Sequence, residues 1–321
     1  MLTIIIPTRN RSKRLSDLIN SFSEIEKTNF SWEVLVIDNN STDNTKDVVR
    51  QLSNKLNFKI NYYFEKKVGL HYARNSGVKR SNTPYLVFLD DDMLVDKSWL
   101  KDFNFILENK TDAYVGKILP YWKSPPPWWL KILVAGGTYP HLGLLNLGNK
   151  QIEIDPIYLY GGNLFIKKNI IEKLKGFNPD GFPLELIKYR GDGEGGLMKK
   201  FKLANYRAYY IPSATVYHIM DSGRLNLDYL CRRAYNEGIS NSFSALRDKN
   251  IPKNKKKNFL RIFKIFSVSR LFRFLIEDVL LFYVKLKLSK KLREGYNYHQ
   301  NEVKKDKKLY DYVLKENFID D

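Results

Sequence analysis

Residues 2–89 alternate short apolar runs with helical patterns, and this alternation limits the chain to a sheet with crossover helices. The apolar runs that predict strands are Leu2–Ile6, Glu33–Ile37, Phe58–Phe64 and Tyr85–Leu89. Apolar residues at helical spacing follow the first two runs, and a short helix over Leu70–Arg80 is predicted before the fourth. The sequence therefore predicts an α/β fold with a mostly parallel central sheet flanked by helices.

Polar residues follow each predicted strand at its carboxyl end. The four clusters are Pro7-Thr8-Arg9-Asn10, Asp38–Asp43, Gly69–Asn75 and Asp90-Asp91-Asp92. Each cluster alone is also typical of an ordinary turn. Parallel strands end at a common edge, however, and ligands bind in the crevice beyond that edge. Together the clusters predict a binding site there.

Three consecutive carboxylates, Asp90, Asp91 and Asp92, form the densest of these clusters. Adjacent carboxylates repel one another unless a cation or hydrogen-bond donors compensate them, and Mg²⁺ and Mn²⁺ prefer oxygen ligands. Alternate residues of a strand share a face, so Asp90 and Asp92 are predicted to point together and Asp91 to point away. A solvated acidic turn is the alternative to a metal-diphosphate site.

The second half of the chain is less regular. The stretch from Pro120 to Trp129 is rich in proline and tryptophan, which predicts an ordered loop. Residues 188–200 carry a glycine-rich acidic segment into a helix, and Thr215–Ile219 is predicted to be the last strand. The pattern from Asn226 onward is helical.

Four segments of the chain resemble those of family 2 glycosyltransferases, which have the glycosyltransferase-A fold. They are Ile5–Arg11, Val36–Asp43, Gly69–Gly77 and Phe88–Asp92. The resemblance covers roughly the first three quarters of the chain. It implies a catalytic domain at 1–248, with a nucleotide-sugar-binding half at 1–115 and an acceptor half at 116–248. A basic helical extension at 249–321 would follow.

This resemblance implies an inverting, metal-dependent transfer of a hexosyl group from a nucleoside diphosphate sugar to a hydroxyl of a glycan or lipid-linked acceptor. Such a reaction would serve cell-surface polysaccharide or glycolipid assembly. The implied nucleotide-sugar-binding residues are Pro7, Thr8, Asn10, Asp38, Arg74, Asp90 and Asp91. Asp92 and His218 would hold Mn²⁺ or Mg²⁺, although a lone histidine beside a strand is also compatible with a structural role. Gly161, Gly162 and Asn163 would contact the acceptor.

The family also places a carboxylate base at the start of a helix in the second half. Asp192 takes that position, although Gly191 replaces the glutamate that usually precedes the base. Glu194 lies near the same predicted helix start and is the alternative base. A helix N-cap is the non-catalytic alternative for Asp192.

Lys and Arg outnumber Asp and Glu by 54 to 35, and the net charge of +19 favours anionic partners. Thirteen of these basic residues and only two acids lie between Lys253 and Arg293. The apolar residues there are too interrupted to cross a bilayer, so the segment predicts a basic amphipathic helix on an anionic membrane surface. A helix packed on the catalytic domain is the alternative.

We expect a cytoplasmic protein on the inner face of the cell membrane. The single cysteine, Cys231, excludes an internal disulfide framework.

Two other classes of function are weaker. An oxidoreductase could use Asp38 to bind an adenosine ribose, but the first strand is not followed by the glycine-rich turn that such enzymes need. A nucleic-acid-binding protein would fit the charge, but no recognised motif supports it. We therefore expect no nucleic-acid partner.

Overall fold

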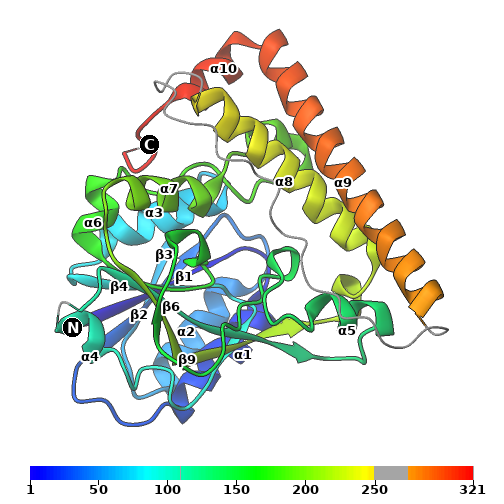
Figure 1. The fold of residues 1–321 in the computed structure, drawn as a ribbon. Coiled ribbons are helices and arrows are strands. Elements are labelled where there is room, and N and C mark those ends of the chain that lie inside the picture. The colour runs from blue at the N-terminus through cyan, green and yellow to red at the C-terminus, as the bar shows by residue number, and fades with distance from the viewer. Residues whose placement is uncertain (109, 249–273, 321) are drawn as a thin grey trace.

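The computed structural model describes residues 1–108, 110–248 and 274–320, and these residues form one nine-stranded sheet with helices around it (Figure 1). The strands are β1 (Leu2–Thr8), β2 (Trp32–Asp38), β3 (Ile60–Phe64), β4 (Tyr85–Leu89), β5 (Met93–Val95), β6 (Ala113–Trp122), β7 (Ile152–Glu153), β8 (Asn163–Lys167) and β9 (Ala208–Met220). The helices are α1 (Ser12–Ser21), α2 (Thr45–Lys55), α3 (Leu70–Arg80), α4 (Asn104–Leu107), α5 (Trp128–Val134), α6 (Lys168–Lys173), α7 (Gly193–Leu203), α8 (Leu227–Asp248), α9 (Phe274–Lys305) and α10 (Lys307–Leu314).

The four predicted parallel strands are confirmed as the neighbours β3, β2, β1 and β4. Strand β1 lies between two others and is buried along its whole length, which is why its apolar run is continuous rather than alternating. In Figure 1, α1 and α2 lie below this part of the sheet and α3 lies above it. The carboxyl ends of β1, β2 and β4 therefore meet at one edge.

The sheet changes direction after β4. Strand β8 is antiparallel to β4 and to β6, and β9 is parallel to β6. The short strand β5 pairs antiparallel with β9 and places Met93 opposite His218. This pairing brings the acidic triplet next to a histidine that is far away in the sequence.

The loop predicted from Pro120 to Trp129 is wrong at both ends. Residues 120–122 continue β6, and Trp128 begins α5 after Pro127, whose backbone is extended. The strand tolerates Pro120 because the backbone N–H groups of alternate residues in a strand point toward the same neighbouring strand. Ile118 exchanges hydrogen bonds with Leu145 rather than with β9, so Pro120 removes no donor from the β6–β9 ladder.

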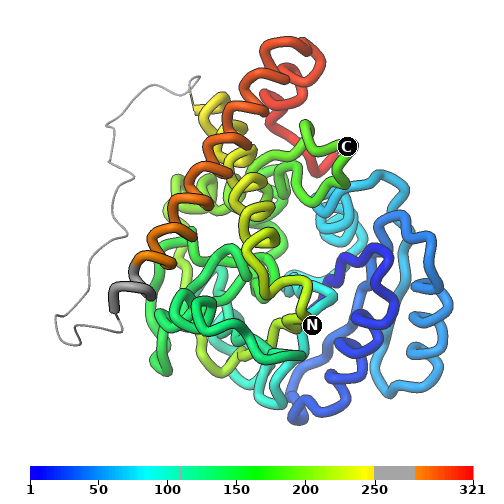
Figure 2. Tube along the Cα trace, turned by 90° about the vertical axis from the view of Figure 1, so that its right-hand side faces the viewer, coloured from blue at the N-terminus to red at the C-terminus, as the bar shows by residue number. Residues whose placement is uncertain are grey.

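Helices α8 and α9 lie side by side over most of their lengths (Figure 2). Glycines permit this close approach. A Cβ atom at Gly238 would lie 1.9 Å from the carbonyl oxygen of Leu292, and one at Gly295 would lie 2.0 Å from that of Tyr235. Any larger residue at either position would force the two helices apart.

The end of the chain packs against α3. Asn75 on α3 donates hydrogen bonds from Nδ2 to the carbonyl oxygens of Phe177 and Phe318, at 3.1 and 2.9 Å. The Phe318 ring is fully buried in a cluster with Phe243, Val303, Leu309 and Val313. The predicted division at residue 248 remains a prediction, but these contacts join residues 274–320 to α3 and α8.

We predict that Phe318→Ala lowers the free energy of unfolding by about 3–5 kcal/mol, because it leaves a cavity in this buried cluster. Urea unfolding measures the change. Phe64→Ala is the matched control, since the Phe64 side chain is 49% exposed and its removal should cost less than about 1 kcal/mol. Equal losses in the two variants would contradict the packing described here.

Candidate active site

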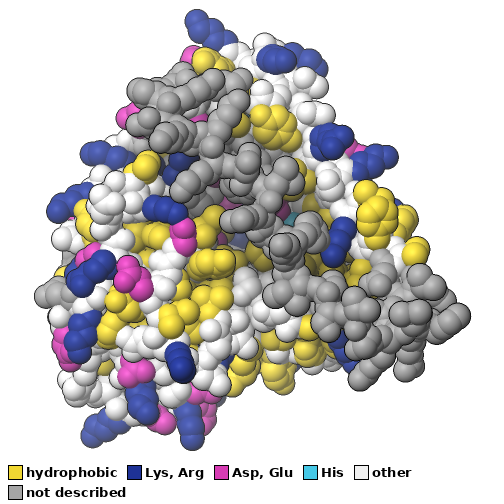
Figure 3. Space-filling view, viewed as in Figure 1, with side chains coloured by type: hydrophobic (Ala, Val, Ile, Leu, Met, Phe, Trp, Pro, Cys, Tyr) yellow, Lys and Arg dark blue, Asp and Glu magenta, His cyan; other side chains and the backbone are white. Residues whose placement is uncertain are grey.

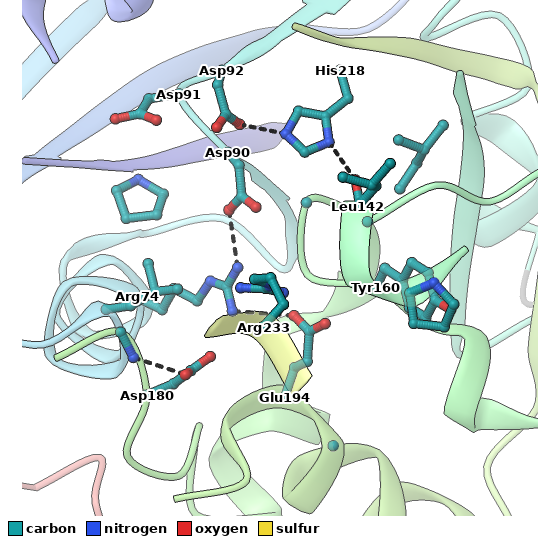
Figure 4. A pocket seen from close by; sticks show the side chains of 18 of the residues that line it. Arg74, Asp90, Asp91, Asp92, Leu142, Tyr160, Asp180, Glu194, His218 and Arg233 are labelled. Carbon is teal, nitrogen blue, oxygen red and sulfur yellow. Dashed lines mark hydrogen bonds and ion pairs between the residues drawn. The ribbon is translucent and has the colours of Figure 1, made fainter. Parts of the chain in front are cut away.

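A cavity of about 630 Å³ opens at the carboxyl edge of the sheet and is lined by residues from both halves of the chain. Ten of the residues singled out in the sequence line it: Pro7, Thr8, Arg74, Asp90, Asp91, Asp92, Gly162, Asp192, Glu194 and His218. The other four, Asn10, Asp38, Gly161 and Asn163, are not part of its lining. Figure 4 shows the Asp92–His218 pair on one side, Glu194 on the other, and Asp90 and Arg74 between them.

The three adjacent aspartates do not alternate as a strand would require. They lie in the turn between β4 and β5, so the expected sharing of one face by Asp90 and Asp92 is wrong. Asp90 accepts a hydrogen bond from Arg74 at 3.0 Å. Asp91 and Asp92 instead share Arg11, whose Nη1 lies 2.9 and 3.1 Å from their carboxylates.

Asp91 is a buried carboxylate on the β1 side of the site. It accepts hydrogen bonds from the Thr8 hydroxyl at 2.7 Å and from Arg11 at 2.9 Å. Burial raises the pKa of Asp91 to about 6, against the opposing effect of Arg11. Arg11 belongs to the first matching segment, but no pattern in the sequence indicated that it would pair with the triplet.

Asp92 is surrounded by cationic and histidine side chains. Besides Arg11, its carboxylate contacts His218 Nε2 at 3.3 Å and accepts a short hydrogen bond from Arg224. Although burial opposes ionisation, His218, Arg224 and Arg11 hold the pKa of Asp92 well below its usual range. Arg224 follows β9 in a short 3₁₀ turn, and sequence reasoning missed it.

His218 is oriented by its backbone contact. Its Nδ1 lies 2.9 Å from the carbonyl oxygen of Leu142, which can only accept, so Nδ1 carries the proton. The other ring nitrogen, Nε2, then faces Asp92. The guanidinium of Arg224 lies at this point, with Nη1 2.5 Å from His218 Nε2.

A carboxylate and an imidazole nitrogen that converge on one point are suitable donors for Mn²⁺ or Mg²⁺. Arg224 already places a positive charge there. Residues 1–108, 110–248 and 274–320 contain no group of three or more His, Cys, Asp or Glu side chains that could hold a metal ion. Among the described residues, Asp92 and His218 are therefore the two side chains that would hold such a cation.

Arg74 connects the triplet to the start of α7. Its guanidinium is buried and donates to Asp90 at 3.0 Å and to Glu194 at 3.2 Å. The Glu194 carboxylate also accepts the backbone N–H of Gly161 at 2.7 Å. Desolvation raises the pKa of Glu194, and Arg74 opposes that rise. A third of the Glu194 side chain, 33%, remains accessible.

Asp192 lies at the N-cap position of α7, but its side chain makes no capping hydrogen bond. One carboxylate oxygen accepts from Asn178 at 2.7 Å, and the other accepts from Ser244 at 2.6 Å. Burial raises the pKa of Asp192 despite these two donors. Both of its oxygens are therefore engaged in contacts with the protein.

Three of the residues outside the lining form hydrogen bonds with other parts of the chain. Asp38 accepts hydrogen bonds from the Ser41 backbone and the Tyr62 hydroxyl, both at 2.8 Å, and Asn39 lines the cavity in its place. Asn10 accepts a hydrogen bond from the Thr42 backbone at 2.7 Å. Asn163 accepts one from Trp99 at 2.9 Å.

Comparison with known sequences identifies the family of the chain. The sequence profile described as Glycosyl transferase family 2 matches residues 3–175, which is more than half of the chain. The chain belongs to this family. The resemblance noted in the sequence is thereby confirmed.

Two curated relatives come from Staphylococcus aureus, and both are poly(ribitol-phosphate) β-N-acetylglucosaminyltransferases. TarP is 26% identical over 269 residues, which is 80% of this chain and 75% of TarP. TarS is 32% identical over 117 residues, which is 36% of this chain but only 20% of the length of TarS.

Two solved structures share the fold at 15% sequence identity. The mannosyltransferase PcManGT from Pyrobaculum calidifontis, in complex with GDP-Man and Mn²⁺, has a TM-score of 0.56 over 94% of this chain and 73% of its own. Residues 1–349 of Staphylococcus aureus TarS, in complex with UDP-GlcNAc, have a TM-score of 0.51 over 94% and 92%. The glycosyltransferase-A fold is confirmed.

Proposed function

We propose that this family 2 glycosyltransferase moves a sugar from a nucleoside diphosphate sugar to an acceptor hydroxyl and inverts the anomeric configuration. The main support for this proposal is a single cavity that has Asp92 and His218 on one side and Glu194 on the other. In-line displacement needs the leaving diphosphate and the base on opposite sides of the sugar. The arrangement in Figure 4 supports that geometry.

The proposed donor site lies along the triplet. Thr8 and Asp91 line the β1 side, while Arg74 and Asp90 approach the sugar and its phosphate. Asp92 and His218 would hold Mn²⁺ or Mg²⁺, which neutralises charge on the departing diphosphate. Arg11 and Arg224 lie beside the same carboxylate, and their guanidinium groups are suited to contact phosphate oxygens.

For the base, the contacts favour Glu194 over Asp192, the residue predicted from sequence. Glu194 reaches the cavity beside Gly161, whereas both oxygens of Asp192 accept hydrogen bonds from Asn178 and Ser244. We propose that Glu194 removes the proton from the acceptor hydroxyl as that oxygen attacks. Arg74 would keep Glu194 oriented, and Asp192 would stiffen the start of α7.

The acceptor class is proposed from the relatives. TarP and TarS are named for transfer to poly(ribitol-phosphate), so a polyol-phosphate polymer is the first acceptor class to test. Other cell-surface glycans and lipid-linked intermediates are the next acceptor classes to test. We propose that the reaction takes place at the cytoplasmic face of the membrane, where such intermediates are assembled.

A donor screen tests this function. Purified full-length protein is incubated with UDP-, GDP- and dTDP-sugars and Mn²⁺, and release of the nucleoside diphosphate is measured with and without acceptor. UDP-GlcNAc is the first candidate because it is bound in the TarS structure. We expect turnover of one donor and a product of inverted configuration by NMR. A retained configuration would overturn the mechanism, and no turnover of any donor would overturn the function.

A further inference from the structure

A stripe of exposed apolar side chains runs along the first half of α9. Val279, Phe282, Tyr283 and Leu286 are 65%, 62%, 46% and 53% exposed. Residues three, four and seven positions apart share one face of a helix, so these four form a continuous stripe. The opposite face carries Leu281, which is 7% exposed, and Val284, which is 2% exposed. Helix α9 therefore has two apolar faces, and one of them lies open.

Basic side chains flank the open stripe. Lys285, Lys287 and Lys290 are exposed, and they lie to either side of it or at its end. Figure 3 shows yellow and dark blue side chains interspersed along this edge of the molecule. The sequence predicted membrane binding for Lys253–Arg293, of which residues 253–273 lie outside the described chain. The stripe lies in residues 274–293, the part of this segment that the structure describes.

The neighbouring helix α5 also exposes apolar side chains. It contacts α9, and Trp129 and Leu133 of α5 pack against the same buried cluster as Leu288 of α9. On its outer side α5 exposes Trp128 by 45% and Ile132 by 36%. Tryptophan and tyrosine are the side chains best suited to the boundary between water and lipid.

We propose that the stripe Val279–Leu286, with its flanking lysines, docks on the anionic surface of a lipid bilayer. The apolar side chains would enter the boundary between headgroups and acyl chains, and the lysines would extend to lipid phosphates. No helix of the described residues is long and apolar enough to cross a membrane. The helix would lie flat on the surface.

Charge argues for lipid over a second copy of the chain. Two copies meeting through this stripe would bring their flanking lysines together, on a protein that already carries +19. An anionic bilayer instead neutralises those charges. Docking would also leave the cavity free, because α8 lines it with Tyr229, Arg233 and Glu237 and lies between it and α9.

Vesicle sedimentation tests the proposal with the full-length protein and no donor or acceptor, so its outcome is independent of the proposed function. Vesicles contain phosphatidylcholine with or without phosphatidylglycerol. The test variant is Phe282→Ser with Leu286→Ser. The matched control is Leu184→Ser with Leu203→Ser, which removes two equally apolar side chains that are 81% and 69% exposed elsewhere. Lys287→Gln with Lys290→Gln examines the charge.

We expect the wild-type chain and the leucine control to sediment with anionic vesicles. The Phe282/Leu286 variant should bind at least about tenfold more weakly than the wild type. The lysine variant should also bind more weakly than the wild type, and this difference should be largest at low salt, where charges are least screened. Binding by the Phe282/Leu286 variant equal to that of wild type would overturn the proposal, as would no binding by wild type. A dimer in analytical ultracentrifugation that this variant disperses, without vesicle binding by wild type, would assign the stripe to a second copy.

Discussion

Glu194→Gln is expected to reduce sugar transfer by about 10²- to 10⁴-fold, the usual contribution of a general base. The amide cannot accept the proton of the acceptor hydroxyl, yet it keeps nearly the same shape beside Arg74 and Gly161. Donor affinity, measured by calorimetry with the nucleotide sugar, should therefore change little. Asp192→Asn is the matched variant, and it should reduce transfer much less because that carboxylate already accepts hydrogen bonds from Asn178 and Ser244.

The pH profile separates the two carboxylates further. Burial raises the pKa of Glu194, and only its ionised form can act as a base. Transfer should therefore rise with pH through that raised pKa, and the rising limb should disappear in Glu194→Gln but persist in Asp192→Asn. If Asp192→Asn proves to be the inactive variant and loses the limb, the base is Asp192, as the sequence predicted.

Asp92→Asn is expected to lower transfer by on the order of 10²-fold or more and to abolish binding of Mn²⁺ in the presence of nucleoside diphosphate. The neutral amide is a poor ligand for a hard cation, and the described chain provides no third carboxylate or histidine to replace it. Mn²⁺ binding is followed by electron paramagnetic resonance. Asp47→Asn is the control, since the Asp47 side chain on α2 is 61% exposed and outside the cavity.

Arg224 adds a second measurement to this prediction. Its guanidinium contacts both His218 Nε2 and Asp92, so it would compete with a divalent cation for the same donors. Without donor present, Arg224→Gln should therefore bind Mn²⁺ more tightly than the wild-type protein. Full transfer in excess EDTA would contradict the metal role of Asp92, and it would favour Arg224 as the resident positive charge.

Much of the first half could be predicted from the order of residues alone. Apolar runs and helical spacing are local signals, and the parallel strands and α3 follow them at nearly the predicted bounds. The polar clusters at the strand ends also identified Thr8, Arg74 and the triplet as neighbours. That inference needed only the rule that parallel strands end at a common edge.

The partners of those residues could not be predicted in this way. Arg11, Arg224 and Glu194 meet Asp91, Asp92 and Arg74 because strand pairing and the packing of α7 bring distant segments together. In the turn after β4, Asp91 and Asp92 share a partner while Asp90 contacts Arg74, which differs from the expected pairing of Asp90 with Asp92. No periodicity in the sequence carries that information.

The open stripe on α9 shows the same division. The spacing of its apolar residues can be read from the sequence. The close approach of α8 at Gly238 and Gly295, however, decides which of the two apolar faces of α9 is covered. Local preferences of the chain thus determine the elements and the polar edge. Contacts between residues far apart in sequence decide which carboxylates face the cavity and which apolar face remains exposed, because burial and charge pairing exist only once the elements have packed.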